Sequence, residues 1–189
     1  MTGAQAAEYV LRQNGVTGVR IERVQGNLTD HFDPRSNVIR LSDNVYNSTS
    51  VAAVGVAAHE AGHAVQHAEN YLPNKIRAFI LPFANIGSKA SWMLIILGLV
   101  FTTKIGYTLL YMGIVLFAFS VLFTVATLPV EFNASNRALQ CIKSTNLLSG
   151  EEYDGAKRTL QAAAMTYVAA TLTAIMQLVR LLVIANRKK

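Results

Sequence analysis

The longest run of uncharged and mainly apolar residues lies between Tyr107 and Leu128. As a helix that rises about 1.5 Å per residue, these 22 residues would extend roughly 33 Å, which is enough to cross the hydrocarbon core of a bilayer. A small domain has too little material to cover such a helix on all sides, so a buried core helix is the weaker interpretation. The pattern therefore predicts a membrane-spanning helix.

Two other apolar stretches are candidates for membrane helices. The first, residues 90–103, has only 14 residues, but it can extend back toward Pro82 and pair with 107–128 as a hairpin closed by a tight turn. The second, residues 162–184, contains Arg180, whose long side chain can reach the polar interface while its stem stays in the apolar layer. This second segment either spans the membrane or lies along the protein as an amphipathic helix, and we expect that it spans.

The first 50 residues carry charges every few positions and have the pattern of a soluble fold. A helix is predicted over 2–14, and alternating apolar and polar positions predict short strands over 19–24 and 38–41. Residues 28–34 between the strands are rich in turn formers. A long helix is expected from about 51 to 70, and because it is small and apolar on most faces it should be central and buried.

The second half of the chain predicts two more helices. One should begin at Glu131, after the charge-free span, and another should begin at a capping box over 149–152 and run to about Ala185. The fold class is therefore mainly α with a small β element (α+β). We expect one structural domain with four parts: a cytoplasm-facing part over 1–75, a membrane hairpin over 76–128, a helix and loop bearing Glu131 over 129–160, and a C-terminal helix over 161–189.

Composition and charge agree with a membrane protein. The chain is 52% hydrophobic and only 15% charged, whereas soluble domains have about 25% charged residues. The net charge of +6 comes mainly from Lys and Arg before the hairpin and in the loop after it, which predicts that these parts face the cytoplasm. No nucleic-acid-binding pattern accompanies the basic residues, so we expect no nucleic-acid partner. Cys141 is the only cysteine, which excludes an internal disulfide and a CxxC site.

The strongest chemical motif is HExxH, formed by His59, Glu60 and His63 on the predicted 51–70 helix. Residues four apart lie one turn apart on the same helix face, so both imidazoles can reach one metal ion. Glu60 is offset by one residue and can contact a water at that ion. Two histidine ligands and a carboxylate base are the groups that a zinc hydrolase needs. Two surface histidines are the weaker interpretation, because the preceding residues 51–58 are apolar enough to be buried.

Catalytic zinc usually has three protein ligands, so a third must come from elsewhere in the chain. His67 lies another turn along the helix and is expected to form a hydrogen bond near the helix end or the site rather than to bind the same ion. Glu131 follows the charge-free span. Because a hairpin returns the chain to the side it left, Glu131 should lie at the level of His59 and His63. The alternative is that Glu131 only caps the helix that begins there.

The segment LTDHFDPRSNVIRLSDNVYNSTSVAAVGVAAHEAGHAVQHAENYLP, with LPVEFNASNRAL downstream, resembles the YugP-like family of bacterial neutral zinc metallopeptidases over nearly the whole chain. The resemblance implies a multi-pass protein of the bacterial plasma membrane with a gluzincin-like HExxH core. It also implies a site similar to those of the HtpX-like and CAAX prenyl proteases. In such a site one Zn²⁺ would be held by His59, His63 and Glu131. Glu60 would act as the base.

The sequence departs from the related families at two points. HtpX-like enzymes have an Asp four residues after the ligand glutamate, where this chain has Ser135. The group that orients a zinc-bound imidazole must then be a hydroxyl or come from elsewhere. YugP-like proteins also usually begin with a further hydrophobic segment, which is not seen before the first predicted helix. An oxyanion donor is needed as well, and the sequence does not choose among Tyr71, Tyr167 and Arg137.

These observations predict a membrane-integrated zinc endopeptidase that hydrolyses peptide bonds of protein or peptide substrates at the cytoplasmic face, in contact with the lipid bilayer. The strand over 38–41 is a candidate for binding an extended substrate by strand addition. The alternative function is a non-catalytic membrane protein with a structural zinc site. The intact Glu60 argues against it, because a closed structural site needs no base. A transporter is disfavoured, because the span over 107–128 offers only hydroxyl groups as polar side chains.

Overall fold

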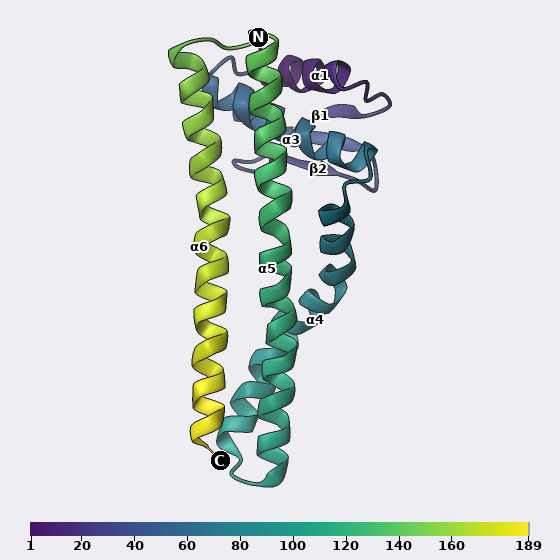
Figure 1. The fold of residues 1–189 in the computed structure, drawn as a ribbon. Coiled ribbons are helices and arrows are strands. Elements are labelled where there is room, and N and C mark those ends of the chain that lie inside the picture. The colour runs from purple at the N-terminus through teal and green to yellow at the C-terminus, as the bar shows by residue number, and fades with distance from the viewer. Residues whose placement is uncertain (189) are drawn as a thin grey trace. The chain divides into compact units, whose positions relative to one another are not determined.

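A computed structural model describes residues 1–188, which form two compact units. The first unit comprises Met1–Asn74 and Val130–Met165, and the second comprises Lys75–Pro129 and Thr166–Lys189. The fold is mainly helical with one small sheet, so the predicted fold class is confirmed (Figure 1). In chain order the elements are α1 (Gly3–Gln13), β1 (Arg20–Val24), β2 (His31–Asp33), β3 (Val38–Ser42), α2 (Asp43–Tyr46), α3 (Val51–Ala68), α4 (Leu72–Val100), α5 (Lys104–Ser144) and α6 (Glu151–Arg187).

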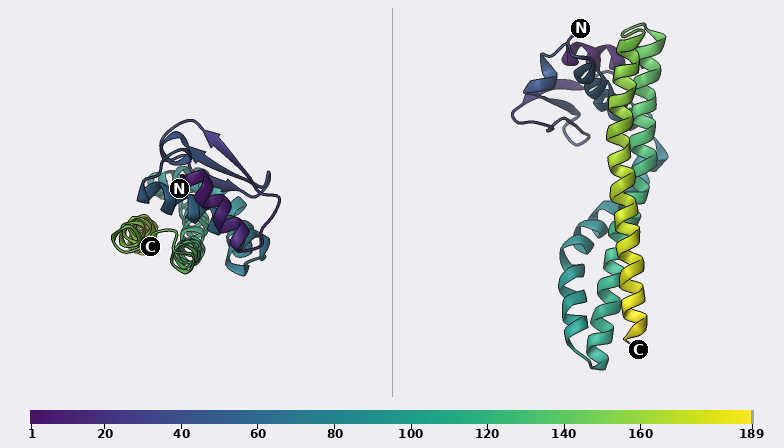
Figure 2. Two further views of the ribbon diagram at one scale, coloured as in Figure 1. Left: turned by 90° about the horizontal axis from the view of Figure 1, so that it is seen from above. Right: turned by 90° about the vertical axis from the view of Figure 1, so that its left-hand side faces the viewer.

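The three-stranded sheet of the first unit has the order β1-β3-β2. Strand β3 pairs in parallel with β1 and antiparallel with β2, where Phe32 lies opposite Ile39. Figure 2 shows the sheet on one side of α1 and α3. The sequence predicted only a turn over 28–34, but β2 lies inside this segment. Because β2 and β1 occupy both edges of β3, the prediction that the strand over 38–41 binds substrate by strand addition is wrong.

Helix α3 is the central element of the first unit. Its first turn is capped by the Ser50 hydroxyl, which accepts a hydrogen bond from the backbone N–H of Ala53 at 3.2 Å. The helix is surrounded by one core that draws residues from α1, β3, α5 and α6. Its own side chains in this core are mostly alanines, so neighbouring elements approach its backbone closely. The buried core residues include Val10, Leu11, Ile39, Leu41, Ala57, Ala61, Ala138, Ile142 and Leu160.

The closest approach to α3 occurs at Gly62, inside the HExxH motif. A Cβ atom at this position would lie 2.7 Å from the backbone oxygen of Ala134 on α5. Gly55 on the same helix is different, because a Cβ there would meet the Cβ of Ala156 at 3.6 Å, an ordinary contact distance. Only glycine at position 62 therefore allows α3 and α5 to pack at this separation.

This contrast predicts opposite effects for two identical substitutions. Gly55→Ala should stabilise the protein by up to about 1 kcal/mol through helix propensity. Gly62→Ala should be less stable than wild type by about 1–3 kcal/mol, because the new methyl group pushes α5 away. Thermal unfolding of both variants in detergent would measure the difference. Equal stability of the two variants would contradict the close packing of α3 on α5.

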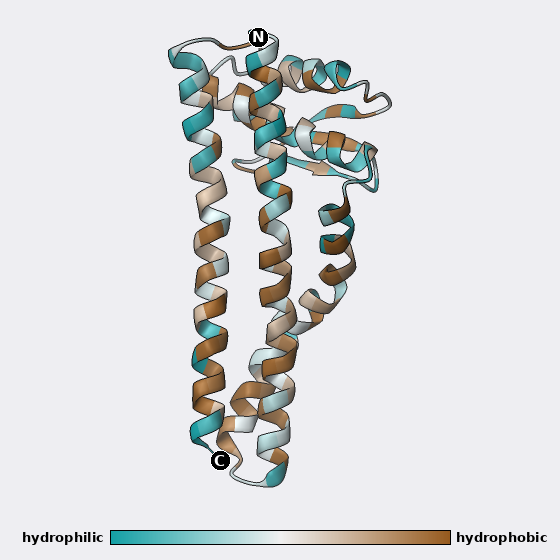
Figure 3. Cartoon of the chain, viewed as in Figure 1, coloured by the Kyte–Doolittle hydropathy of each residue, from teal (hydrophilic) through white to brown (hydrophobic). Residues whose placement is uncertain are grey.

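The second unit contains the apolar parts of α4, α5 and α6. All three helices are long and apolar enough to cross a membrane, and Figure 3 shows their hydrophobic residues gathered in long stretches. Helices α4 and α5 pack closely through glycines, since a Cβ at Gly87 or Gly98 would overlap the backbone of Leu116 or Leu110. Small residues at such contacts are typical of packed membrane helices.

The sequence predicted a span over 107–128 and a separate helix from Glu131, but α5 is continuous from Lys104 to Ser144. Pro129 lies inside this helix. A proline removes one backbone donor and usually bends or ends a helix, which is why the pattern indicated a break there. The structure continues the helix through Pro129, so Glu131 lies inside α5 and not at a helix start.

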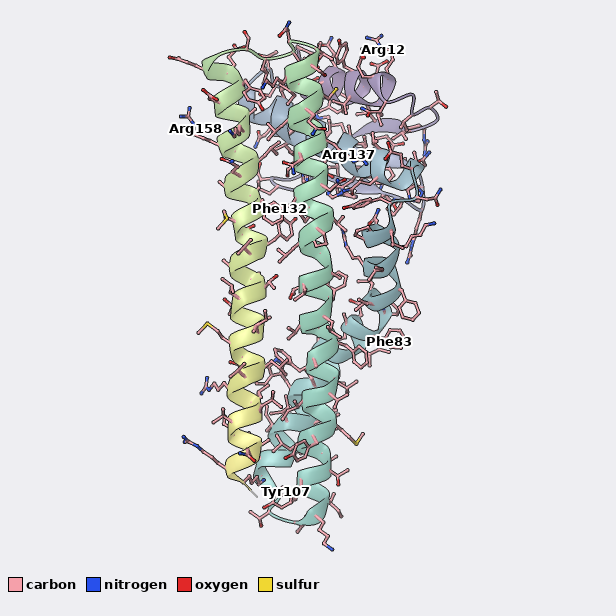
Figure 4. All side chains as sticks on the ribbon, viewed as in Figure 1. Arg12, Phe83, Tyr107, Phe132, Arg137 and Arg158 are labelled. Atoms are coloured by element: carbon pink, nitrogen blue, oxygen red, sulfur yellow. The ribbon has the colours of Figure 1, made fainter. Side chains whose placement is uncertain are left out.

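The end of α6 contacts the turn between α4 and α5 within the second unit. The Lys188 ammonium group donates hydrogen bonds to the backbone carbonyls of Gly98, Leu99 and Phe101. The hydroxyl of Tyr107, labelled in Figure 4, donates to the carbonyl of Lys188. Carbonyls at a helix C-terminus lack partners within the helix, and a lysine satisfies both their hydrogen bonding and their negative dipole. These contacts join the end of α6 to the turn between α4 and α5.

Candidate metal centre

Three side chains from α3 and α5 meet in the first unit. The Nε2 atoms of His59 and His63 lie 3.1 Å apart. A carboxylate oxygen of Glu131 lies 3.3 Å from Nε2 of His59 and 3.6 Å from Nε2 of His63. These residues form a group whose potential ligand atoms all lie within 4.8 Å of one another. The structure thus places Glu131 beside both histidines of the HExxH motif.

The separations within this group fit a tetrahedral metal ion. Bonds of ~2.0–2.1 Å from zinc to nitrogen and oxygen would separate neighbouring ligand atoms by about 3.3 Å. The observed separations of 3.1, 3.3 and 3.6 Å lie on either side of this value. The donor set of two imidazoles and one carboxylate is also a set that zinc prefers. The residues present therefore fit a zinc ion with one position left for a further ligand.

Electrostatics favour a cation between these groups. Burial raises the pKa of Glu131, but hydrogen bonds with His59 and His63 outweigh it and hold the pKa well below its usual range. Burial lowers the pKa of His63, but hydrogen bonding to Glu131 and the nearby charges of Glu60 and Glu131 outweigh this effect, so the pKa is raised overall. A carboxylate beside two imidazoles therefore favours a bound cation, either a proton or a metal ion.

The outer nitrogens of both imidazoles have partners that orient the rings. Nδ1 of His59 lies 3.0 Å from the hydroxyl of Ser135, and Nδ1 of His63 lies 3.1 Å from the side-chain oxygen of Gln66. When Nδ1 donates to these oxygens, the lone pair of Nε2 is directed at the centre of the group. Ser135 thus supplies a hydroxyl at the position where HtpX-like enzymes have a carboxylate.

Sequence reasoning missed Gln66. It lies three residues after His63, so both side chains share one face of α3, and it is completely buried. A buried amide in a helix of small apolar residues requires hydrogen-bond partners. Its spacing of three residues from His63 was the signal in the sequence that could have indicated its role.

Glu60, the predicted base, is 8% exposed and lies close enough to His63 for its charge to raise the pKa of that residue. His67 lies in the last turn of α3, where its ring is 5.7 Å from that of Phe32. The three-residue group found among the described residues does not include His67. That His67 does not bind the same ion stays a prediction.

The candidates for an oxyanion donor lie in different surroundings. Arg137 forms an ion pair with Glu69 at 2.7 Å, and Figure 4 labels it on α5. Tyr71 is half-buried after the end of α3, and its backbone N–H donates to the carbonyl of Gln66. Tyr167 is an exposed residue of α6 in the second unit. None of these observations tests the oxyanion role, which stays a prediction for all three residues.

Comparison with known proteins agrees with this site. A family described as "Putative neutral zinc metallopeptidase" matches residues 1–186, and the chain belongs to this family. A relative from Bacillus subtilis (strain 168), named "Putative membrane protease YugP", is 43% identical over 183 residues, which cover 97% of this chain and 80% of the relative. No solved structure matches the chain. The resemblance found in the sequence is therefore confirmed.

Proposed function

We propose that this protein is a membrane-integrated zinc endopeptidase with one Zn²⁺ bound by His59, His63 and Glu131. The observation that carries the proposal is the set of three ligand atoms separated by 3.1–3.6 Å, as tetrahedral coordination requires. Membership of a zinc metallopeptidase family and the apolar helices support it. The relative named as a membrane protease supports the same conclusion.

The residues around the site have complementary roles in hydrolysis. Bound zinc would supply Lewis-acid chemistry, acidifying a water and polarising a peptide carbonyl. Glu60 takes the proton from the attacking water and transfers it to the leaving amine. Ser135 and Gln66 hold the imidazole rings in place through their Nδ1 atoms.

Three protein ligands favour a catalytic over a structural zinc. Structural zinc sites are closed by four protein ligands, whereas catalytic sites keep one position open for water or substrate. Within residues 1–188, the group that contains His59, His63 and Glu131 has no fourth His, Cys, Asp or Glu. The proximity of Glu60 to His63 supports the same choice, because a closed site needs no base.

Metal removal tests this function. Purified protein in detergent should contain about one zinc per chain and should cleave an unfolded protein such as casein. Removal of zinc with a chelator should abolish cleavage, and zinc added in equal amount should restore it, since the three ligands are held together by the fold. Atomic emission and gel assays measure both quantities. Cleavage that persists in metal-free protein would overturn the proposal.

We also propose that the first unit faces the cytoplasm. Nine of the 17 Lys and Arg residues belong to this unit, as expected for the cytoplasmic side of a membrane protein. They are Arg12, Arg20, Arg23, Arg35, Arg40, Arg137, Lys143, Lys157 and Arg158. Three spans would then place the C-terminus outside. Alkaline phosphatase fused to the C-terminus, active only outside the cytoplasm, should be active, and an inactive fusion would contradict this orientation.

A further inference from the structure

A chain of hydrogen bonds leads from His63 to Arg137. Arg137 in turn forms an ion pair with Glu69 at the end of α3. We propose that Gln66, Asn133 and Arg137 form a hydrogen-bond relay that fixes His63 in the tautomer with hydrogen on Nδ1 and a free lone pair on Nε2. This inference deepens the proposed zinc site and rests on it for its functional meaning. The tautomer of His63 can be measured in the metal-free protein, without reference to zinc or to activity.

The first end of the relay is the backbone of α5. The side-chain nitrogen of Gln66 lies 2.8 Å from the carbonyl oxygen of Val130. A backbone carbonyl can only accept a hydrogen bond, so the Gln66 atom that faces it must be the NH₂ group. The other atom of the amide, the oxygen, then faces Nδ1 of His63 at 3.1 Å.

The second end of the relay is Arg137. Its Nε atom lies 2.7 Å from the side-chain oxygen of Asn133, and its guanidinium group is held by Glu69 at 2.7 Å. Arginine has only donors, so the Asn133 atom that faces it must be the oxygen. The same oxygen accepts a hydrogen bond from the NH₂ group of Gln66 at 3.0 Å. Both ends therefore require the same orientation of the Gln66 amide.

This orientation determines the position of the hydrogen on His63. Its Nδ1 faces an amide oxygen, which can only accept, at 3.1 Å, whereas the Glu131 oxygen lies farther from Nε2, at 3.6 Å, so the geometry favours hydrogen on Nδ1 in the neutral ring. The lone pair then lies on Nε2, the atom that faces His59 and Glu131. His59 is different, because its Nδ1 faces the hydroxyl of Ser135, which can either donate or accept. The relay fixes the tautomer of one histidine, and Ser135 leaves that of the other open.

A glutamine suits this position better than a carboxylate. One oxygen of a glutamate at position 66 would still accept from His63. Its second oxygen would face the Val130 carbonyl and the Asn133 side-chain oxygen, two acceptors with which it could form no hydrogen bond. Gln66 is completely buried, so no bulk water would relieve this conflict. The neutral amide donates on one side and accepts on the other.

Nuclear magnetic resonance of ¹⁵N-labelled histidines tests the relay in metal-free protein. The spectra should be recorded at a pH where His63 is neutral. Wild-type His63 should be the Nδ1–H tautomer. Gln66→Met keeps a similar volume but removes the acceptor, so His63 should shift toward Nε2–H. Ser135→Ala is the matched control at the other histidine and should leave the tautomer of His63 unchanged.

Zinc affinity provides the second readout. Gln66→Met should raise the zinc dissociation constant by about 10–100-fold, the range typical for loss of a partner of a metal-bound imidazole. Wild-type His63 in the Nε2–H form would overturn the proposal whether or not the variant folds. An unchanged His63 tautomer or an unchanged zinc affinity in Gln66→Met would also overturn it. None of these measurements requires substrate, so a protein without peptidase activity would contradict the proposed function and leave the relay intact.

Discussion

Replacement of Glu60 by glutamine should reduce peptide-bond hydrolysis by about 10²–10⁴-fold while the protein keeps its zinc. The amide has nearly the same shape as the carboxylate, but it cannot take a proton from the attacking water. Zinc should stay bound, because the three closely spaced ligand atoms belong to His59, His63 and Glu131. Cleavage of casein in detergent and the zinc content per chain measure the two effects separately.

A second Glu→Gln substitution controls for the loss of one negative charge. Glu8 is an exposed residue of α1, and Glu8→Gln should cleave casein at the wild-type rate. Both variants carry the same chemical change relative to wild type. A difference between their cleavage rates therefore reflects the position of Glu60 and not the loss of one charge. If Glu60→Gln cleaved as fast as wild type, Glu60 would not be the base.

Replacement of Glu131 by glutamine should remove the zinc itself. The substitution exchanges an ionised ligand for a neutral amide between two imidazoles, so the attraction for a divalent cation is lost. The zinc dissociation constant should rise by more than the roughly 10–100-fold typical for loss of an outer partner, and activity should disappear with the metal. Competition with a chromophoric chelator measures the affinity.

The matched control for this variant lies at the start of α6. Glu151 is exposed there, and Glu151→Gln should bind zinc as tightly as wild type. Circular dichroism of Glu131→Gln should show the wild-type helix content, which separates loss of a ligand from loss of the fold. Wild-type zinc content in a folded Glu131→Gln protein would show that the carboxylate is not a ligand.

Local patterns were enough to place the histidine pair and most helices. Spacing by four residues places His59 and His63 on one face of a helix wherever that helix packs, so it required no knowledge of the fold. The helix over 51–70 was predicted to within two residues of α3. The strand β2 was missed, because its three residues lie in a segment rich in turn formers and gain their pairing from β3.

The proline in α5 shows a different limit. Pro129 predicted a break because a helix interior normally excludes proline, yet α5 continues on both sides. The predicted meeting of Glu131 with the histidines did not depend on this detail. It followed from a hairpin that returns the chain to the side it left, and such a return requires only two spans.

The amino-acid sequence by itself determined an HExxH helix, apolar segments of membrane length and an acid positioned to complete a metal site. Residue spacing and segment length depend only on residues near one another in the chain, so they required no knowledge of the fold. Only the packing of α3 against α5 decided which oxygen faces each imidazole. Gln66 meets Val130 and Asn133, and Ser135 meets His59, across more than 60 residues of sequence. Hydrogen bonds of this kind depend on the separation of two helix backbones, and Gly62 sets that separation by lacking a side chain.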